Sequence, residues 1–69
     1  MKKENFQALA RLAKMRPGSG AYIGAMKYLV DGTQLQSEIA AELKLNPSTI
    51  SSAVARIYRA ELDAIRATR

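Results

Sequence analysis

The sequence predicts an all-α fold: a small domain of about four helices that contains a helix-turn-helix and ends in a long helix. Apolar residues recur at helical spacing along nearly all of the 69 residues, and no stretch alternates as a strand would. Helix breakers at Pro17-Gly18, Gly32 and Asn46-Pro47 divide this repeat into four segments. The length suits a single domain, residues 1–69, whose small core predicts reinforcement by oligomerisation.

The first helix is predicted over about residues 4–15. Phe6, Leu9 and either Leu12 or Ala13 recur every three or four residues and would form its inward face. The Pro-Gly pair that follows would end this helix.

The second helix is predicted over about residues 20–31. Ser19 can cap its start with the side-chain hydroxyl, and Gly32 can end it in the left-handed conformation that glycine tolerates. Its apolar face is expected at Ile23, Met26, Leu29 and Val30.

The third and fourth helices are predicted over about residues 35–43 and 47–66. Between them Asn46 and Pro47 predict the start of a helix. Proline is tolerated at the first helical position because the backbone N–H group that it lacks would be unpaired there anyway. No breaker follows before the C-terminus. The chain therefore reverses direction over about three residues and continues in one long helix.

These two helices have the sequence form of a helix-turn-helix, in the stretch QSEIAAELKLNPSTISSAVA from Gln36 to Ala55. Ala40 is small where the second helix of the pair would cross it, and Leu43 and Leu45 bracket the turn. Lys44 stands where such turns usually have glycine. A left-handed lysine costs on the order of 1 kcal/mol, which the motif tolerates.

Small hydroxyl side chains cover the predicted outward face of the fourth helix, and a packed core has no use for them. In docked helix-turn-helix proteins the start of this helix lies in the major groove, where serine and threonine bond to base edges and methyl groups touch thymine. Arg56 is the first long donor and is expected to reach a guanine or a phosphate. The residues predicted to read bases are Pro47, Ser48, Thr49, Ser51, Ser52, Ala55 and Arg56.

The charge pattern suits a polyanionic partner. The chain carries 11 lysines and arginines against 6 acids, a net charge of +5. Residues 1–30 and 51–69 are basic, whereas residues 31–50 carry three acids and one lysine. The residues predicted to contact DNA phosphates, at the start of the third helix, in the turn and on neighbouring helices, are Gln36, Ser37, Lys44, Arg59, Lys27, Arg11 and Lys14.

Catalytic and metal-binding functions are not expected. The chain has no cysteine and no histidine, so the commonest metal ligands and general base are missing, and we expect no metal and no cofactor. A catalytic serine would lack a partner base. No apolar run approaches the ~20 residues of a membrane span and no secretory signal is visible, so a cytoplasmic protein without membrane contact is expected.

An apolar stripe on the last helix predicts a homodimer. Tyr58, Leu62 and Ile65 follow one another at helical spacing, and a self-complementary patch suits a two-fold pair. The alternative is a monomer in which this helix folds back on Phe6 and Leu9.

The segment YLVDGTQLQSEIAAELKLNPSTISSAVARIYRA, residues 28–60, resembles the DNA-binding segment of the KorA/TrfB-type repressors of conjugative plasmids. The likeness lies in a Leu-Val-Asp-Gly approach, a Leu-x-Leu turn and an Ala-Val-x-Arg-hydrophobic-aromatic exit, and it covers about half the chain. The segment after Gly32 is one residue longer here, and the separate C-terminal dimerisation region of that family is absent. The resemblance implies a dimeric repressor that binds palindromic operators of plasmid genes.

Two other functions fit the same composition. One is a small helical protein-interaction module, an adaptor or polymerase-associated factor, that binds an acidic protein without reading DNA sequence. The other is an RNA-binding domain, which is less favoured because the exposed aromatic residues expected for single strands are missing.

Overall fold

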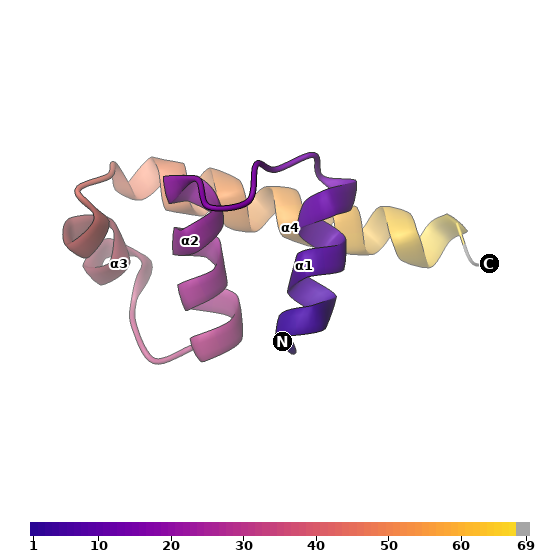
Figure 1. Ribbon diagram of the computed structural model, residues 1–69, viewed down its shortest axis with the longest axis horizontal. Helices are drawn as coiled ribbons and strands as arrows, with labels where there is room; N and C mark the ends of the chain where they lie inside the picture. The colour runs from indigo at the N-terminus through magenta and orange to yellow at the C-terminus, as the bar shows by residue number, and fades with distance from the viewer. Residues whose placement is uncertain (68–69) are drawn as a thin grey trace.

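The structure, a computed structural model, describes residues 1–67 and confirms the all-α fold, with no strand in that range. Helices α1 (Lys3–Leu12) and α2 (Gly20–Met26) stand side by side, and α2 continues into a π-helical turn, η1 (Lys27–Asp31). Helix α3 (Gln36–Leu43) lies at one end of the molecule. Helix α4 (Pro47–Ala67) runs behind α2 and α1 and extends past α1, as Figure 1 shows.

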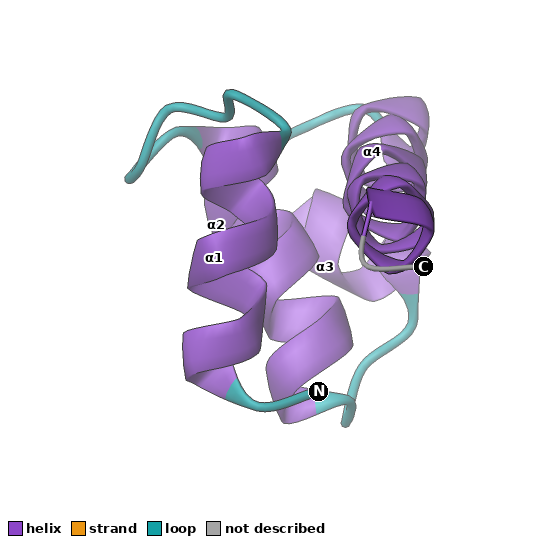
Figure 2. Ribbon diagram, turned by 90° about the vertical axis from the view of Figure 1, so that its right-hand side faces the viewer, coloured by secondary structure: helices purple, strands orange, loops and turns teal. Residues whose placement is uncertain are grey.

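The core lies where α4 meets the other three helices. Its largest fully buried side chains are Phe6, Ile39, Ile50 and Ile57, one from α1, one from α3 and two from α4. Viewed along α4, the other helices lie to one side of it, so that its opposite side faces solvent (Figure 2). The Tyr22 ring packs edge-on against Phe6 with ring centroids 5.2 Å apart, which joins α2 to α1.

Small residues allow α2 and α4 to approach closely. A Cβ atom at Gly24 would collide with the Cδ1 atom of Ile50, and one at Gly20 would lie 3.0 Å from a methyl group of Leu45. Ala40 is also buried, as predicted for a residue beneath a helix crossing. The position of α4 therefore depends on glycine and alanine at these sites as much as on the buried apolar side chains.

The predicted bounds of the last three helices and the predicted start of the first match the structure within one residue, but the predicted end of the first helix does not. α1 ends at Leu12 rather than near residue 15, because Lys14 takes a left-handed conformation (φ 58°) and the Met15 amide donates to the Ala10 carbonyl at 2.9 Å. This is the Schellman type of helix end. Leu12 is consequently exposed.

The second helix has its predicted caps and, apart from Ile23, its predicted inward face. The Ser19 hydroxyl accepts from the Tyr22 amide at 3.2 Å, and Gly32 has φ 67°. Met26, Leu29 and Val30 pack against the core as predicted, whereas Ile23 is exposed and Tyr22 and Ala25 are buried. The π-helical turn, in which the Gly32 amide donates to the Lys27 carbonyl at 3.1 Å, was not predicted.

We expect Ile57→Ala to lower the free energy of unfolding by about 2–4 kcal/mol, because it leaves a cavity at a fully buried site. The exposed Ile23 offers a matched control, at which the same substitution should cost less than about 1 kcal/mol. Urea unfolding followed by circular dichroism measures both. Equal losses would contradict the core described above.

Candidate nucleic-acid interface

Helix α3, the turn of residues 44–46 and the start of α4 form the predicted helix-turn-helix. Lys44 takes the left-handed conformation (φ 57°), as expected for the position that usually holds glycine. The Leu45 amide donates to the Ala40 carbonyl at 2.8 Å, and the Leu45 side chain packs against the core. Helix α4 then begins with the Thr49 amide bonded to the Asn46 carbonyl at 2.9 Å.

The first half of α4 presents a hydroxyl face to solvent, formed by Ser48, Ser51, Ser52, Ala55 and Arg59, all of them exposed. The residues buried on the opposite side of the helix, Ile50, Ala53, Val54 and Ile57, fix this orientation. Helical periodicity alone therefore placed these five residues correctly.

The other three residues predicted to read bases lie at the borders of this face. Pro47 and Arg56 are exposed, whereas Thr49 is half-buried. Thr49 and Arg56 line a shallow hollow with Ser48, Ser52 and Ala21 from the start of α2. Ala21 therefore joins the site from outside the helix-turn-helix. Ala21 lies next to α4 only because of the tertiary fold, and no local sequence pattern predicts this contact.

Arg56 bonds within the protein. Its Nη2 atom donates to the Ala13 carbonyl at 2.6 Å, at the end of α1. This contact links the end of α1 to α4 across 43 residues of sequence. A guanidinium has five N–H donors, so this bond leaves others for a second partner.

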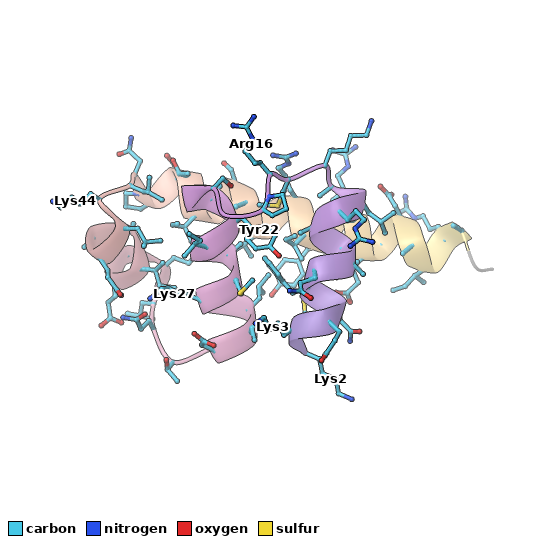
Figure 3. The ribbon with its side chains drawn as sticks, in the orientation of Figure 1. Lys2, Lys3, Arg16, Tyr22, Lys27 and Lys44 are labelled. Atoms are coloured by element: carbon cyan, nitrogen blue, oxygen red, sulfur yellow. The ribbon has the colours of Figure 1, made fainter. Side chains whose placement is uncertain are left out.

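Helices α1 and α3 end in the same way, each with a lysine where glycine is usual. Lys14 and Lys44 both have a left-handed backbone conformation, and both side chains are exposed. The backbone hydrogen bonds at the two helix ends are those of the Schellman motif. Each lysine therefore carries on the order of 1 kcal/mol of backbone strain. Figure 3 shows Lys44 pointing away from the molecule at one end and Arg16 pointing away from the α1–α2 loop.

Of the remaining predicted phosphate contacts, Arg11 is exposed near the end of α1, two residues before the Ala13 carbonyl that holds Arg56. Arg16, which the sequence did not single out, is exposed in the loop after α1. Basic side chains therefore cluster at the end of α1, beside the α4 segment that carries Arg56 and Arg59.

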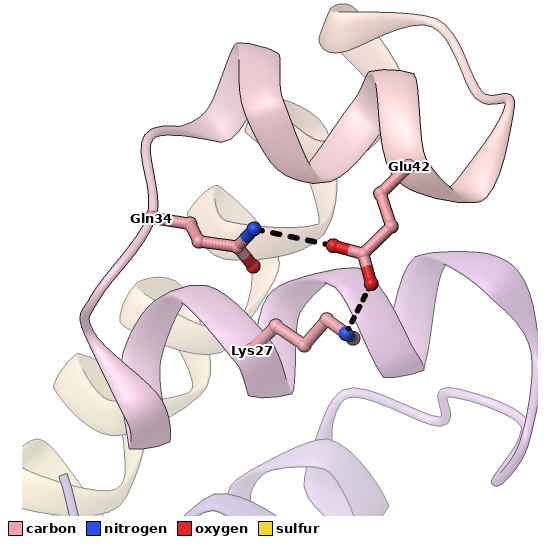
Figure 4. A network of polar contacts seen from close by, with 3 residues as sticks. All are labelled: Lys27, Gln34 and Glu42. Carbon is pink, nitrogen blue, oxygen red and sulfur yellow. Dashed lines mark hydrogen bonds and ion pairs between the residues drawn. The ribbon is translucent and has the colours of Figure 1, made fainter.

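Lys27 is placed differently, because its ammonium pairs with the Glu42 carboxylate at 2.9 Å (Figure 4). Gln34 donates to the other oxygen of Glu42 at 3.2 Å. These two hydrogen bonds, with the charge of Lys27 added, lower the pKa of Glu42 below its ordinary value. A phosphate contact by Lys27 would have to compete with this internal partner.

The start of α3 also has an internal anion. The Glu38 carboxylate accepts from the Leu35 amide at 2.9 Å. Gln36 and Ser37 follow as the first two residues of the helix, so the carboxylate already uses part of the favourable field there. Together with Glu42, Glu38 makes α3 the acidic side of the motif.

The predicted dimerisation residues are all partly exposed. Tyr58, Leu62 and Ile65 retain 50, 53 and 44% of their accessible surface. The last helix does contact α1, because Ala60 is buried and Leu9 lines a hollow with Ala64 and Ile65. Contact with α1, the alternative arrangement considered above, therefore occurs but leaves this apolar stripe open.

Comparisons with protein-family models, with curated proteins and with solved structures found no match for the chain. Within residues 1–67, no cluster of three or more acidic, histidine or cysteine side chains could hold a metal ion. No helix in the described part combines the length and apolar character needed to cross a membrane.

We expect Glu42 to titrate below the ordinary range of glutamate, and Lys27→Ala to raise its pKa, since the variant removes the main donor. A lowered folded-state pKa stabilises the fold above the unfolded-state pKa, and this contribution disappears as the pH falls through the folded-state value. Lys27→Ala should therefore destabilise the protein near neutral pH but not in acid. NMR titration of the carboxyl carbon measures the pKa, and an unchanged value in the variant would contradict the ion pair.

Proposed function

We propose that the protein is a sequence-specific repressor that binds double-stranded DNA with the first half of α4 in the major groove. The observation that carries this proposal is the hydroxyl face, in which three exposed serines lie beside Ala55 and Arg59 on the second helix of a helix-turn-helix. Basic residues border it at the turn, on α4 itself and at the end of α1.

The hydroxyl face suits a groove better than a protein surface. Small side chains let the helix backbone approach the base edges, and each serine can donate to or accept from a base. The methyl groups of Thr49 and Ala55 are suited to thymine. An apolar partner, by contrast, would leave these hydroxyls unpaired, which costs about 1–3 kcal/mol for each buried group.

The two left-handed lysines support phosphate contacts. Glycine would relieve the strain at Lys14 and at Lys44, yet both positions carry an exposed positive charge. Arg11 and Arg59 extend the basic border, while Arg56 would either read a guanine or bind phosphate with the donors that Ala13 does not use. Lys27, Gln36 and Ser37 are weaker candidates because of their acidic neighbours.

The wider assignment follows the resemblance to the KorA/TrfB-type repressors. On that basis the protein acts in the cytoplasm as a homodimer, without a cofactor, on palindromic operators of plasmid genes. It is a binding protein rather than an enzyme, since its exposed serines have no histidine to activate them.

Selection of bound sequences from a random duplex pool at ~150 mM salt tests the proposal. Enrichment of a defined motif is expected. Binding without enrichment that disappears as salt rises would overturn sequence-specific recognition and favour a protein-interaction module.

We expect Ser52→Glu to weaken binding to the selected duplex by about 10- to 100-fold, because a carboxylate would replace a hydroxyl at the base edges. Thr33→Glu adds the same charge in the loop before α3, at the opposite end of α2 and η1 from the hydroxyl face, and serves as the control. Fluorescence anisotropy measures both affinities. Equal effects would show that net charge alone governs binding.

We expect Lys44→Gly to raise the free energy of unfolding by about 0.5–1 kcal/mol through relief of strain, whereas Lys44→Ala should not raise it. Both variants should reduce the salt slope of DNA binding by ~0.9 if the ammonium contacts one phosphate. Urea unfolding and binding across a salt series separate the two effects. A gain in stability with an unchanged slope would remove Lys44 from the interface.

A further inference from the structure

The second half of α4 carries an open apolar surface that continues onto α3. Leu62 and Tyr58 are about half exposed, and Leu35, the residue before α3, retains 66% of its accessible surface. Leu35 and Tyr58 line a common hollow with Met1, and Met1 lines a second hollow with Ile65. We call Leu35, Tyr58, Leu62 and Ile65 the apolar face.

The apolar face and the hydroxyl face lie about a fifth of a turn apart on α4. With 3.6 residues per turn, the mean direction of Tyr58, Leu62 and Ile65 is about 70° from the mean direction of the five residues of the hydroxyl face. Consider two antiparallel α4 helices that contact each other through their apolar faces and are related by a two-fold axis perpendicular to both. The two hydroxyl faces then point to the same side of the dimer. Both hydroxyl faces could then meet one surface.

We infer that the occupant of the apolar face is a second copy of this chain, bound with the second halves of the two α4 helices antiparallel and the two-fold axis near Leu62. The apolar residues fit this arrangement because their order is self-complementary when reversed. Leu62 meets Leu62 of the second copy, and Tyr58 meets Ile65. An isologous pairing of this kind closes on itself as a dimer.

The length of α4 is consistent with a second copy as the occupant. About nine residues separate the centre of the hydroxyl face, near residue 53, from Leu62, or about 13 Å of helix. Twice this length along the helices, combined at a right angle with a lateral separation of about 8–10 Å between the helix axes, places the two hydroxyl faces about 28 Å apart. Successive major grooves on one side of B-DNA lie ~34 Å apart, so grooves one turn apart are the pair nearest this spacing. The inference rests on the proposed function for this spacing, but not for the dimer itself.

Sedimentation of the full chain without DNA tests the dimer. The chain should be dimeric at tens of micromolar, and Leu62→Glu should be monomeric with an unchanged helical spectrum, because this side chain is already half exposed. Ile23→Glu places the same charge on an exposed isoleucine of α2 and should stay dimeric. A monomeric wild type, or two variants that behave alike, would overturn the inference.

The random-duplex selection distinguishes this inference from the proposed function. Wild type should enrich inverted repeats with centres about 10 base pairs apart, and Leu62→Glu should enrich one isolated half-site with ~100-fold weaker binding to the repeat. Single half-sites from the wild type would overturn the dimer geometry and leave DNA reading in place. A dimer in sedimentation that enriches no sequence would overturn the proposed function and the α4 spacing argument together.

Discussion

The contact between Gly24 and Ile50 is the constraint on which the rest of the structure depends. Ile50 is fully buried, and its terminal methyl group occupies the space that any side chain at position 24 would fill. This contact sets how closely α2 lies over the start of α4. Because Ile50 must point inward there, helical periodicity fixes which residues of α4 point outward. The hydroxyl face is thus a consequence of one tight crossing.

Most of the fold could be predicted from the sequence because its helices end at strong local signals. Ser19, Gly32 and Pro47 act through their own backbone and side-chain chemistry, so they place the ends of helices regardless of tertiary contacts. The end of α1 lacked such a signal. Lys14 takes the left-handed conformation that glycine usually adopts, and the proline that was predicted to end the helix comes only at position 17.

One residue of the predicted inward face of the second helix, Ile23, was predicted wrongly for a tertiary reason. Ile23 fits an apolar helical repeat as well as Tyr22 does, and the two are adjacent in sequence. The choice depends on Phe6, whose ring Tyr22 meets edge-on, and on Gly24, which turns the close-packed side of the helix toward α4. Contacts between distant segments, such as Arg56 with Ala13 or Lys27 with Glu42, are hidden from local patterns in the same way.

The strain at Lys14 and Lys44 lowers the stability of the monomer by a small amount that the fold tolerates. Two left-handed lysines cost about 2 kcal/mol together, against a total stability of about 5–15 kcal/mol for a folded protein. Neither side chain is buried, so packing offers no compensation within the monomer. Each ends a helix that packs directly against α4, one beside its first residues and the other beside Arg56. A phosphate bound by a charged donor could offset the strain at either position, because hydrogen bonds to charged groups contribute about 1.5–3 kcal/mol. A phosphate bound at these helix ends is therefore one interaction that would compensate for the strain at both positions.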